Sequence, residues 1–195
     1  RDCLLSRGLG DVYKRQQFRT IRDNALKLIM EAQKYIYIQT PYFVPDDSVL
    51  EALKIASLSG VKIKIMIPDK PDHFFIYWIN QYFVGELLDL GVEVYKYNKG
   101  FIHSKLIVVD DEVVSTGTAN FDYRSFYQNF EINVNIYEKD VAQSFRKIFF
   151  NDIKHSTRLL RSEYSKRSYY IKFKESVCRF CLLYTSPSPR DKRQS

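Results

Sequence analysis

Hydrophobic and polar residues alternate along the chain with two different periods, which predict helices and strands. Apolar side chains recur on one helical face from Phe18 to Ala32, and the run from Tyr35 to Gln39 has the character of a short strand. Ser48 and Glu51 have the spacing of a capping box, which predicts that a second helix starts there. Gly60 is expected to end that helix.

The alternation of strands and helices continues up to residue 97. Apolar residues occupy every second position of the segment 61–67, as in a strand with one buried face. A long helix is predicted from about Asp72 to Leu90, where Gly91 stops it, and residues 92–97 again have the character of a strand. Strands that are separated by helices favour a sheet in largely parallel order.

The pattern changes after residue 97 and predicts antiparallel elements. Segments 103–109 and 112–116 flank Asp110 and Asp111, which indicates a tight hairpin. Alternation of apolar and polar residues at 130–136 predicts a further strand. The sheet is therefore expected to be mixed.

The last part of the chain holds one more helix and a basic tail. An apolar helical stripe over 141–149 predicts the helix, and beyond Asp152 no clear period remains. The basic residues that follow could meet anionic lipid or simply form a solvated face; they are Lys154, Arg158, Arg161, Lys166 and Arg167.

Two terminal stretches differ from the rest, because Ser6–Gln16 and Cys181–Asp191 are irregular and rich in Gly, Ser, Pro and Arg. One choice of codons makes them reverse complements of each other apart from single end bases, which resembles a transposon-type sequencing adapter translated at both ends of a DNA fragment. We therefore expect residues 1–16 and 181–195 to lie outside the fold and residues 17–180 to form one domain. Other codons in the source DNA would contradict this.

Net charge, cysteine content and the length of apolar runs argue against several classes of protein. The formal charge of +7 falls to +3 without residues 1–16 and 181–195, which contribute two net positive charges each. Such a modest charge does not argue for a nucleic-acid partner. Cys178 is then the single cysteine, too few for a disulfide within the chain or a zinc site. No apolar run approaches the ~18 to 20 residues of a membrane-spanning helix.

Polar residues interrupt the strand-like segment at 103–109 and suggest a phosphate site. On a strand, His103 and Lys105 would project from one face, roughly 7 Å apart. A lysine ammonium can hold phosphate oxygens while an imidazole attacks phosphorus or protonates the leaving oxygen. Gly117 allows close backbone approach, and Thr118 and Asn120 can add hydrogen-bond donors for the charge of the transition state.

The complete spacing resembles the HxKxxxxD(x)6GSxN signature of the phospholipase D superfamily, with Thr118 in place of the usual serine. It is carried by His103, Lys105, Asp110, Gly117 and Asn120. The resemblance implies a supporting, more structural than chemical role for Asp110. It also places Glu131 where that family often has an acidic residue that hydrogen-bonds the catalytic histidine and stabilises imidazolium. The alternative is that Glu131 lies on the solvated face of its strand.

A wider resemblance covers nearly all of residues 17–180. Five segments look like the C-terminal catalytic half of bacterial cardiolipin synthases: 40–47, 59–73, 82–97, 99–105 and 116–140. This resemblance implies an α/β fold, a phospholipase D-like mixed β-sheet flanked by helices on both faces. It also implies phosphatidyl transfer without a metal or organic cofactor. A catalytic histidine attacks one phosphatidylglycerol, glycerol leaves, and a second phosphatidylglycerol takes the phosphatidyl group from the phospho-histidine.

The family uses two such motifs, one from each half of a pseudo-dimer, and this chain carries one. The resemblance implies that one histidine is the nucleophile and the other the general acid and base; for a motif of the second half we favour general acid for His103. The expected partners are the N-terminal half with the first motif, or a second copy, together with phosphatidylglycerol and an anionic membrane surface. No nucleic acid is expected. The fragment alone should be inactive unless two copies pair to rebuild the site. The expected place of action is the cytoplasmic side of a bacterial cytoplasmic membrane.

Further residues carry weaker predictions. His73 follows Asp72 at a loop-to-helix junction where cardiolipin synthases commonly have the same pair, so it is either a substrate contact or a surface histidine. The aromatic residues Tyr77, Trp78 and Tyr82 either meet a lipid headgroup or belong to the core.

Two alternative functions stay open. One is a phospholipase D-type phosphodiesterase or nuclease, in which water takes the place of the alcohol acceptor. The other is a non-enzymatic lipid-binding module, against which the intact motif argues. Replacing His103 by alanine separates the enzymes from the module, because a binding module should keep its function.

Overall fold

The computed structural model describes residues 20–70, 74–171, 173–174 and 177–178. The stretches 1–16 and 181–195 and the candidate substrate contact His73 lie outside the described residues. Their sequence-based predictions therefore stay predictions.

A seven-stranded mixed sheet forms the centre of the domain, in the order β8-β6-β5-β1-β3-β4-β9. Its strands are β1 (Tyr35–Gln39), β3 (Lys62–Pro68), β4 (Glu93–Tyr97), β5 (Leu106–Val109), β6 (Val113–Gly117), β8 (Asn133–Ile136) and β9 (Ser156–Leu159). The neighbours β1, β3 and β4 run parallel, and all other pairs in this sheet are antiparallel. The predicted change from parallel to antiparallel order is confirmed.

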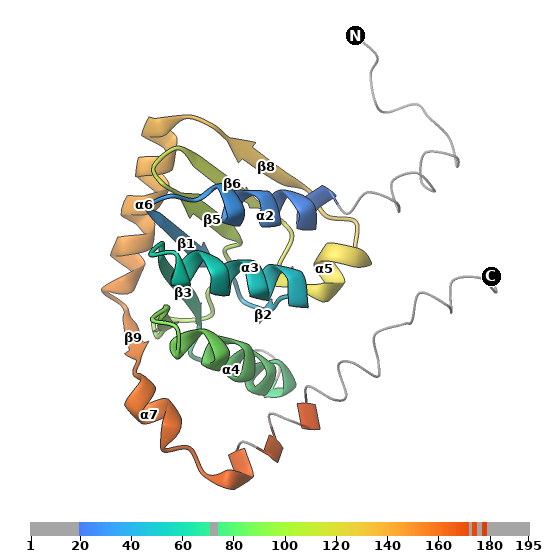
Figure 1. Ribbon diagram of the computed structural model, residues 1–195, viewed down its shortest axis with the longest axis vertical. Helices are drawn as coiled ribbons and strands as arrows, with labels where there is room; N and C mark the ends of the chain where they lie inside the picture. Colours follow the sequence, from blue (N-terminus) through green and yellow to red (C-terminus); the bar gives the residue numbers. More distant parts are fainter. Residues whose placement is uncertain (1–19, 71–73, 172, 175–176, 179–195) are drawn as a thin grey trace, which may run out of the picture.

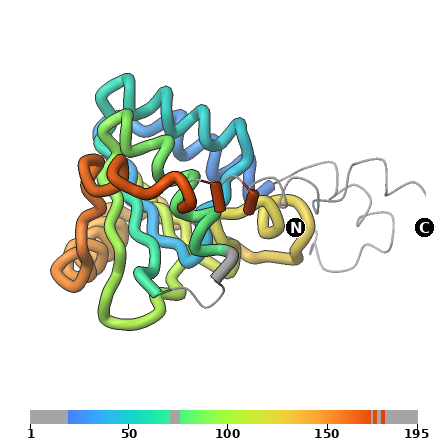
Figure 2. The backbone as a smooth tube through the Cα atoms, turned by 90° about the horizontal axis from the view of Figure 1, so that it is seen from below, coloured from blue at the N-terminus to red at the C-terminus, as the bar shows by residue number. Residues whose placement is uncertain are grey.

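Helices cover both faces of this sheet (Figure 1). On one face lie α2 (Thr20–Glu31), α3 (Asp47–Leu58) and α4 (Phe74–Leu88), and on the other α6 (Lys139–Ile153). Seen from below, the tube has α6 in orange on one side of the strands and α2 and α3 in blue and teal on the other (Figure 2). Two short helices, α5 (Tyr123–Tyr127) and α7 (Arg161–Ser165), complete the fold.

The core follows directly from this layering. All five residues of β1 are buried, because helices cover both faces. Ile36 and Ile38 point into the cluster that α2, α3 and α4 build, whereas Tyr35 and Tyr37 face the cluster that contains Phe149 of α6. The aromatic rings of Tyr37 and Phe149 stack with their centroids 5.1 Å apart.

Three strands and the two short helices α5 and α7 were not predicted from the sequence. Short strands β2 (Phe43–Val44) and β7 (Phe121–Asp122) pair in parallel, and β9 pairs antiparallel with β4 at the edge of the sheet. None of these three has a strong apolar alternation. Their backbone hydrogen bonds with a neighbouring strand define them, and such pairings are not visible in a local pattern.

The cap of α3 corrects the sequence analysis, because Asp46 and not Ser48 precedes the helix. The Asp46 carboxylate accepts a hydrogen bond from the backbone N–H of Val49 at 2.8 Å. It also accepts from Arg22 Nε at 2.9 Å and from the Tyr127 hydroxyl. One carboxylate thus joins α2, α3 and α5.

Replacing Asp46 by alanine is expected to lower the free energy of unfolding by about 2 kcal/mol at pH 7, since a helix cap and the partner of a half-buried guanidinium are lost together. Burial raises the pKa of the Asp46 carboxyl, but hydrogen bonds from Tyr127, Val49 and Arg22 outweigh it, so the pKa lies below its usual 3.8.

The stabilising contribution of Asp46 is therefore fully present above the unfolded-state pKa and is lost as the pH falls through the lower folded-state pKa. Urea unfolding at pH 7 and at stepwise lower pH measures it. The exposed neighbour Asp47 is the matched control, and its alanine variant should change stability by less than about 0.5 kcal/mol. Equal stability of the Asp46 and Asp47 variants would contradict the assignment.

Candidate active site

The candidate site lies at the end of the sheet where β1 stops and β5 begins. His103 and Lys105 precede β5, so the prediction that the strand starts at residue 103 is wrong. The reason is the length of β1: Gln39 pairs with Leu106, and the next residue, Thr40, donates its N–H to Met66 O of β3 instead. Residues 103–105 therefore have no strand partner on that side.

His103 and Lys105 are nevertheless held together. The Lys105 ammonium donates to the backbone oxygen of His103 at 2.8 Å, and the Lys105 carbonyl accepts from Thr116 Oγ1 at 3.0 Å. His103 is exposed, with its ring centroid 5.8 Å from that of Phe101. The imidazole is thus open to a ligand while its neighbour is anchored to the sheet.

Lys105 is half-buried, which lowers the pKa of its ammonium below the usual value. The negative charges of Glu131 and Asp122 act in the opposite direction. A cation that is partly stripped of water and only partly compensated is well prepared to receive a phosphate oxygen.

Glu131 organises the loop that closes the site. Its carboxylate accepts hydrogen bonds from the Thr118 hydroxyl, from Ser125 Oγ at 3.2 Å and from Asn129 Nδ2 at 3.1 Å. Ser125 Oγ in turn accepts from the backbone N–H of Asn120 at 3.1 Å. These hydrogen bonds of Glu131 hold the loop from 118 to 131 together, and the expected hydrogen bond from Glu131 to His103 stays a prediction.

The sequence analysis missed Ser125 and Asp122. Asp122 precedes α5, and its carboxylate accepts from the N–H of Ser125 at 2.7 Å. Burial raises the pKa of Asp122, and the charge of Glu131 adds to this, against the hydrogen bonds from Ser125. The signal in the sequence was the Asp-x-x-Ser spacing of a helix cap at residues 122–125.

Gly117 is required by a close contact between β6 and the start of β8. A Cβ atom there would lie 2.0 Å from the carbonyl oxygen of Ile132 and 2.5 Å from Asn133 Oδ1. The close backbone approach that Gly117 permits is therefore to this segment. A contact with phosphate stays a prediction.

Replacing Gly117 by alanine is expected to push residues 131–133 away from β6 and to lower the free energy of unfolding by about 1 to 3 kcal/mol. The Thr118–Glu131 hydrogen bond should weaken at the same time, because both residues flank the displaced contact. Urea unfolding measures the first effect, with an alanine at the exposed hairpin residue Glu112 as control. An unchanged stability of the Gly117 variant would show that the segment moves freely.

Asp110 does not belong to this cluster, because it lies at the opposite end of β5 from Lys105. Its carboxylate accepts the backbone N–H groups of Gln33 at 2.6 Å, Lys34 at 2.9 Å and Tyr35 at 2.7 Å. Asp110 and Asp111 both have positive φ, and Glu112 N donates to Val109 O, as in a type I′ hairpin turn. Asp110 thus ties the turn between α2 and β1 to the hairpin.

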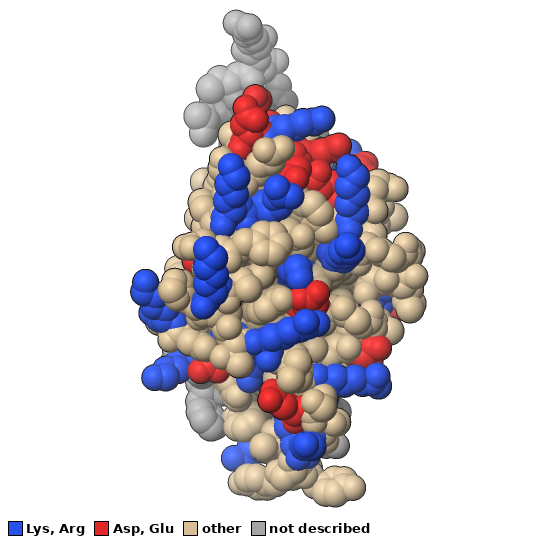
Figure 3. Space-filling view, turned by 90° about the vertical axis from the view of Figure 1, so that its left-hand side faces the viewer, with Lys and Arg blue, Asp and Glu red and all other residues tan. Residues whose placement is uncertain are grey.

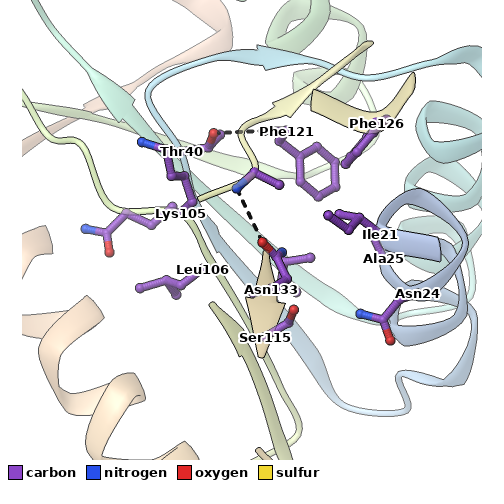
Figure 4. A pocket seen from close by; sticks show the side chains of 13 residues that line it. Ile21, Asn24, Ala25, Thr40, Lys105, Leu106, Ser115, Phe121, Phe126 and Asn133 are labelled. Carbon is purple, nitrogen blue, oxygen red and sulfur yellow. Dashed lines mark hydrogen bonds between the residues drawn. The ribbon is translucent and has the colours of Figure 1, made fainter. Parts of the chain in front are cut away.

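A small cavity lies behind Lys105, between the sheet and α2 (Figure 4). Its polar lining includes Gln39, Ser115 and Asn133. The fully buried Gln39 donates to Asp152 Oδ2 of α6 at 2.8 Å. The cavity volume of about 20 Å³ admits a water-sized group and no phospholipid headgroup. The open face of His103 lies on the surface and not in this cavity.

The described residues lack two features that bear on function. No group of three or more His, Cys, Asp and Glu side chains among them has an arrangement that could hold a metal ion. In the same part of the chain, no helix combines the length and apolar character needed to cross a membrane.

Comparison with known proteins identifies related sequences. A family model described as cardiolipin synthase, PLD-like domain, matches residues 25–153. A cardiolipin synthase of Listeria monocytogenes is 50% identical over 163 residues, which cover 84% of this chain and 34% of that protein. One from Staphylococcus aureus is 48% identical over 162 residues, with 83% and 33% covered. The chain spans about a third of the length of these relatives.

Solved structures show the same fold at low sequence identity. The phosphatidylserine synthase of Haemophilus influenzae superposes with a TM-score of 0.65 at 17% identity, over 84% of this chain and 42% of that one. The phospholipase D family member Nuc of Salmonella typhimurium gives a TM-score of 0.63 at 23% identity, over 71% and 90%. The expected mixed sheet with helices on both faces is confirmed.

Proposed function

The chain belongs to the phospholipase D-like cardiolipin synthase family, and on that premise we propose that it forms one catalytic half of a phosphatidyltransferase. The proposed enzyme makes cardiolipin and glycerol from two molecules of phosphatidylglycerol. The observation that carries the proposal is the exposed His103 next to the anchored, half-buried ammonium of Lys105.

The proposed reaction has two displacements at phosphorus. The histidine of a second motif attacks the phosphorus of one phosphatidylglycerol, and the bond from phosphorus to the glycerol oxygen breaks. His103 donates a proton to that oxygen, so glycerol leaves. His103 then takes a proton from a hydroxyl of the second phosphatidylglycerol, and the oxygen of that hydroxyl attacks the phosphorus of the phospho-histidine. The bond from phosphorus to the histidine nitrogen breaks, which frees the histidine and gives cardiolipin. Lys105, Thr118 and Asn120 would hold the phosphate oxygens during both steps.

The second motif is proposed to come from another half-domain, either an N-terminal half of the same protein or a second copy. An exposed apolar row next to the site supports such a partner. Phe130, Ile132 and Val134 are 98%, 73% and 53% exposed, and Ile132 directly follows Glu131. Val134 lies on β8, an edge strand of the sheet. Exposed apolar side chains on a sheet edge favour pairing with another domain.

The proposed place of action is the cytoplasmic side of a bacterial cytoplasmic membrane, where the lipid substrates are. We also propose that residues 1–16 and 181–195 take no part in this function, as their unusual composition suggests.

A chimera tests the proposal. The matched segment of the Listeria enzyme is replaced by that of this chain, and the lipids formed from labelled phosphatidylglycerol are separated and identified. Cardiolipin from the chimera is the expected result, and the isolated chain should form none unless two copies pair to complete the site. A chimera that unfolds cooperatively but forms no cardiolipin would contradict the proposed function.

A further inference from the structure

Positive charge is concentrated in the last quarter of the fold. Residues 139–174 contain ten Lys and Arg against three Asp and Glu, a net charge of +7. Residues 17–138 contain twelve against sixteen, a net charge of −4. The modest overall charge of the domain is therefore the sum of a negatively charged part, 17–138, and a strongly basic part, 139–174.

The structure places this segment on one side of the molecule. α6, β9 and α7 follow one another along the side that faces away from α2 and α3 (Figure 1). Figure 3 looks onto this side and shows lysine and arginine side chains spread over it. We define the basic face by the exposed residues Lys147, Lys154, Arg158, Arg161 and Lys166.

Few carboxylates balance the basic face. Arg161 pairs with Asp89 at 2.8 Å, and Arg158 lies 3.8 Å from Glu93. Lys147, Lys154 and Lys166 have no ion pair within the described part of the chain. Surface pairs such as these two contribute little and do not cancel the field of the face.

The segment that carries these cations also exposes apolar side chains. Ile148 and Leu160 are 52% and 45% exposed, and the aromatic residues Tyr169 and Phe173 are 91% and 66% exposed. Lys174 Nζ lies 4.4 Å from the centroid of the Tyr170 ring. Aliphatic side chains gain nothing from a nucleic-acid backbone, whereas at a bilayer surface they enter the apolar boundary while the cations meet the headgroups.

The basic face also reaches the end of the sheet where the candidate site lies. Asp152, near the end of α6, accepts the hydrogen bond from Gln39, and Gln39 lines the same cavity as Lys105. Lys154 follows two residues later. A surface that held the basic face would therefore lie close to the entrance of the site.

We propose that the face formed by α6, β9, α7 and residues 168–171, 173 and 174 docks this protein onto an anionic lipid bilayer. The role of this docking rests on the proposed function, because the proposed lipid substrate lies in that bilayer. The binding itself can be measured without turnover. The cations supply the attraction to anionic headgroups, and Tyr169, Tyr170 and Phe173 enter the headgroup boundary.

Vesicle cosedimentation with the full 195-residue chain tests this. The vesicles contain phosphatidylcholine with phosphatidylserine, or phosphatidylcholine alone, so no phosphatidylglycerol is present. One variant carries Lys154→Gln, Arg158→Gln, Arg161→Gln and Lys166→Gln. Its matched control loses the same charge elsewhere through Lys27→Gln, Lys34→Gln, Lys62→Gln and Lys70→Gln. The basic-face variant should bind anionic vesicles at least about 100-fold more weakly, and the control should stay within a few-fold of the parent chain.

The single tryptophan provides a second readout. Trp78 lies under Lys174, whose Nζ is 5.5 Å from the ring centroid. Its fluorescence should be quenched by nitroxide lipids labelled near the headgroup when the parent chain binds. Equal loss of binding in both variants, equal binding to neutral vesicles, or stronger binding to nucleic acid than to anionic vesicles would each overturn the proposal.

Failure of this inference is distinguishable from failure of the proposed function. In the chimera, the basic-face substitutions should lower turnover on vesicles and leave turnover in detergent micelles unchanged. An equal loss in micelles and on vesicles would overturn membrane docking as the role of this face. A parent chimera inactive in micelles would instead contradict the proposed function.

Discussion

Replacing His103 by alanine in the chimera should lower the rate of cardiolipin formation by at least about 10³-fold. The imidazole is the group proposed to protonate the leaving glycerol and then to deprotonate the incoming hydroxyl, and an alanine side chain can do neither. His103 is exposed, so its loss should leave the free energy of unfolding almost unchanged.

The matched control is His155, which is also exposed and contributes its backbone oxygen to Asn98 N. Alanine at position 155 keeps that backbone contact and should leave the rate unchanged. If the His103 and His155 variants were equally active, His103 would have no part in the chemistry. A binding module in place of an enzyme would then be the better explanation.

Replacing Lys105 by methionine is expected to lower kcat by about 10² to 10³-fold, with a smaller effect on KM. Methionine keeps most of the length and apolar stem of lysine but removes the ammonium. The substitution also removes the 2.8 Å hydrogen bond to the His103 oxygen, so His103 should become more mobile. Steady-state rates on micellar phosphatidylglycerol separate kcat from KM.

Lys99 is the matched control for Lys105, because it is an exposed lysine six residues earlier in the same connection. Methionine at position 99 should change kcat by less than about threefold. An arginine at position 105 keeps the charge but not the compact ammonium and should be intermediate. A full rate with methionine at position 105 would exclude the ammonium from phosphate stabilisation.

The local hydrophobic pattern predicted an element correctly where burial of its own residues decides the structure. β1 begins and ends at the predicted residues Tyr35 and Gln39, because helices bury both of its faces and its apolar run is continuous. The hairpin around Asp110 was also visible, since two turn residues separate two apolar runs. The stops at Gly60 and Gly91 were predicted too, and both have positive φ.

Features that depend on a distant partner were not predictable. The sequence predicted that His103 belongs to a strand. The neighbouring strand β1 ends at Gln39, which pairs with Leu106, so no partner is left for residue 103. Asp46 caps α3 in place of Ser48 because Arg22 and Tyr127 add two further hydrogen bonds. Both cases are decided by tertiary contacts and not by the residues next to them.

In the candidate site, too, some features follow from the local sequence and others depend on distant contacts. The spacing of the motif identified its residues, but the network in which Glu131 accepts from Thr118 and Ser125 depends on how the loop from 118 to 131 closes. The position of Asp110 at the far end of β5 follows once that strand is assigned. Its three backbone hydrogen bonds explain why a carboxylate stands there.

The identity of the phosphatidyl acceptor is the most direct test of the account. Phosphatidylglycerol labelled separately in its glycerol headgroup and its acyl chains is given to the chimera, and all products are counted. We expect one free glycerol for each cardiolipin and almost no phosphatidic acid, since an alcohol takes the phosphatidyl group. One phosphatidic acid for each glycerol released, without cardiolipin, would mean that water is the acceptor and would contradict the account.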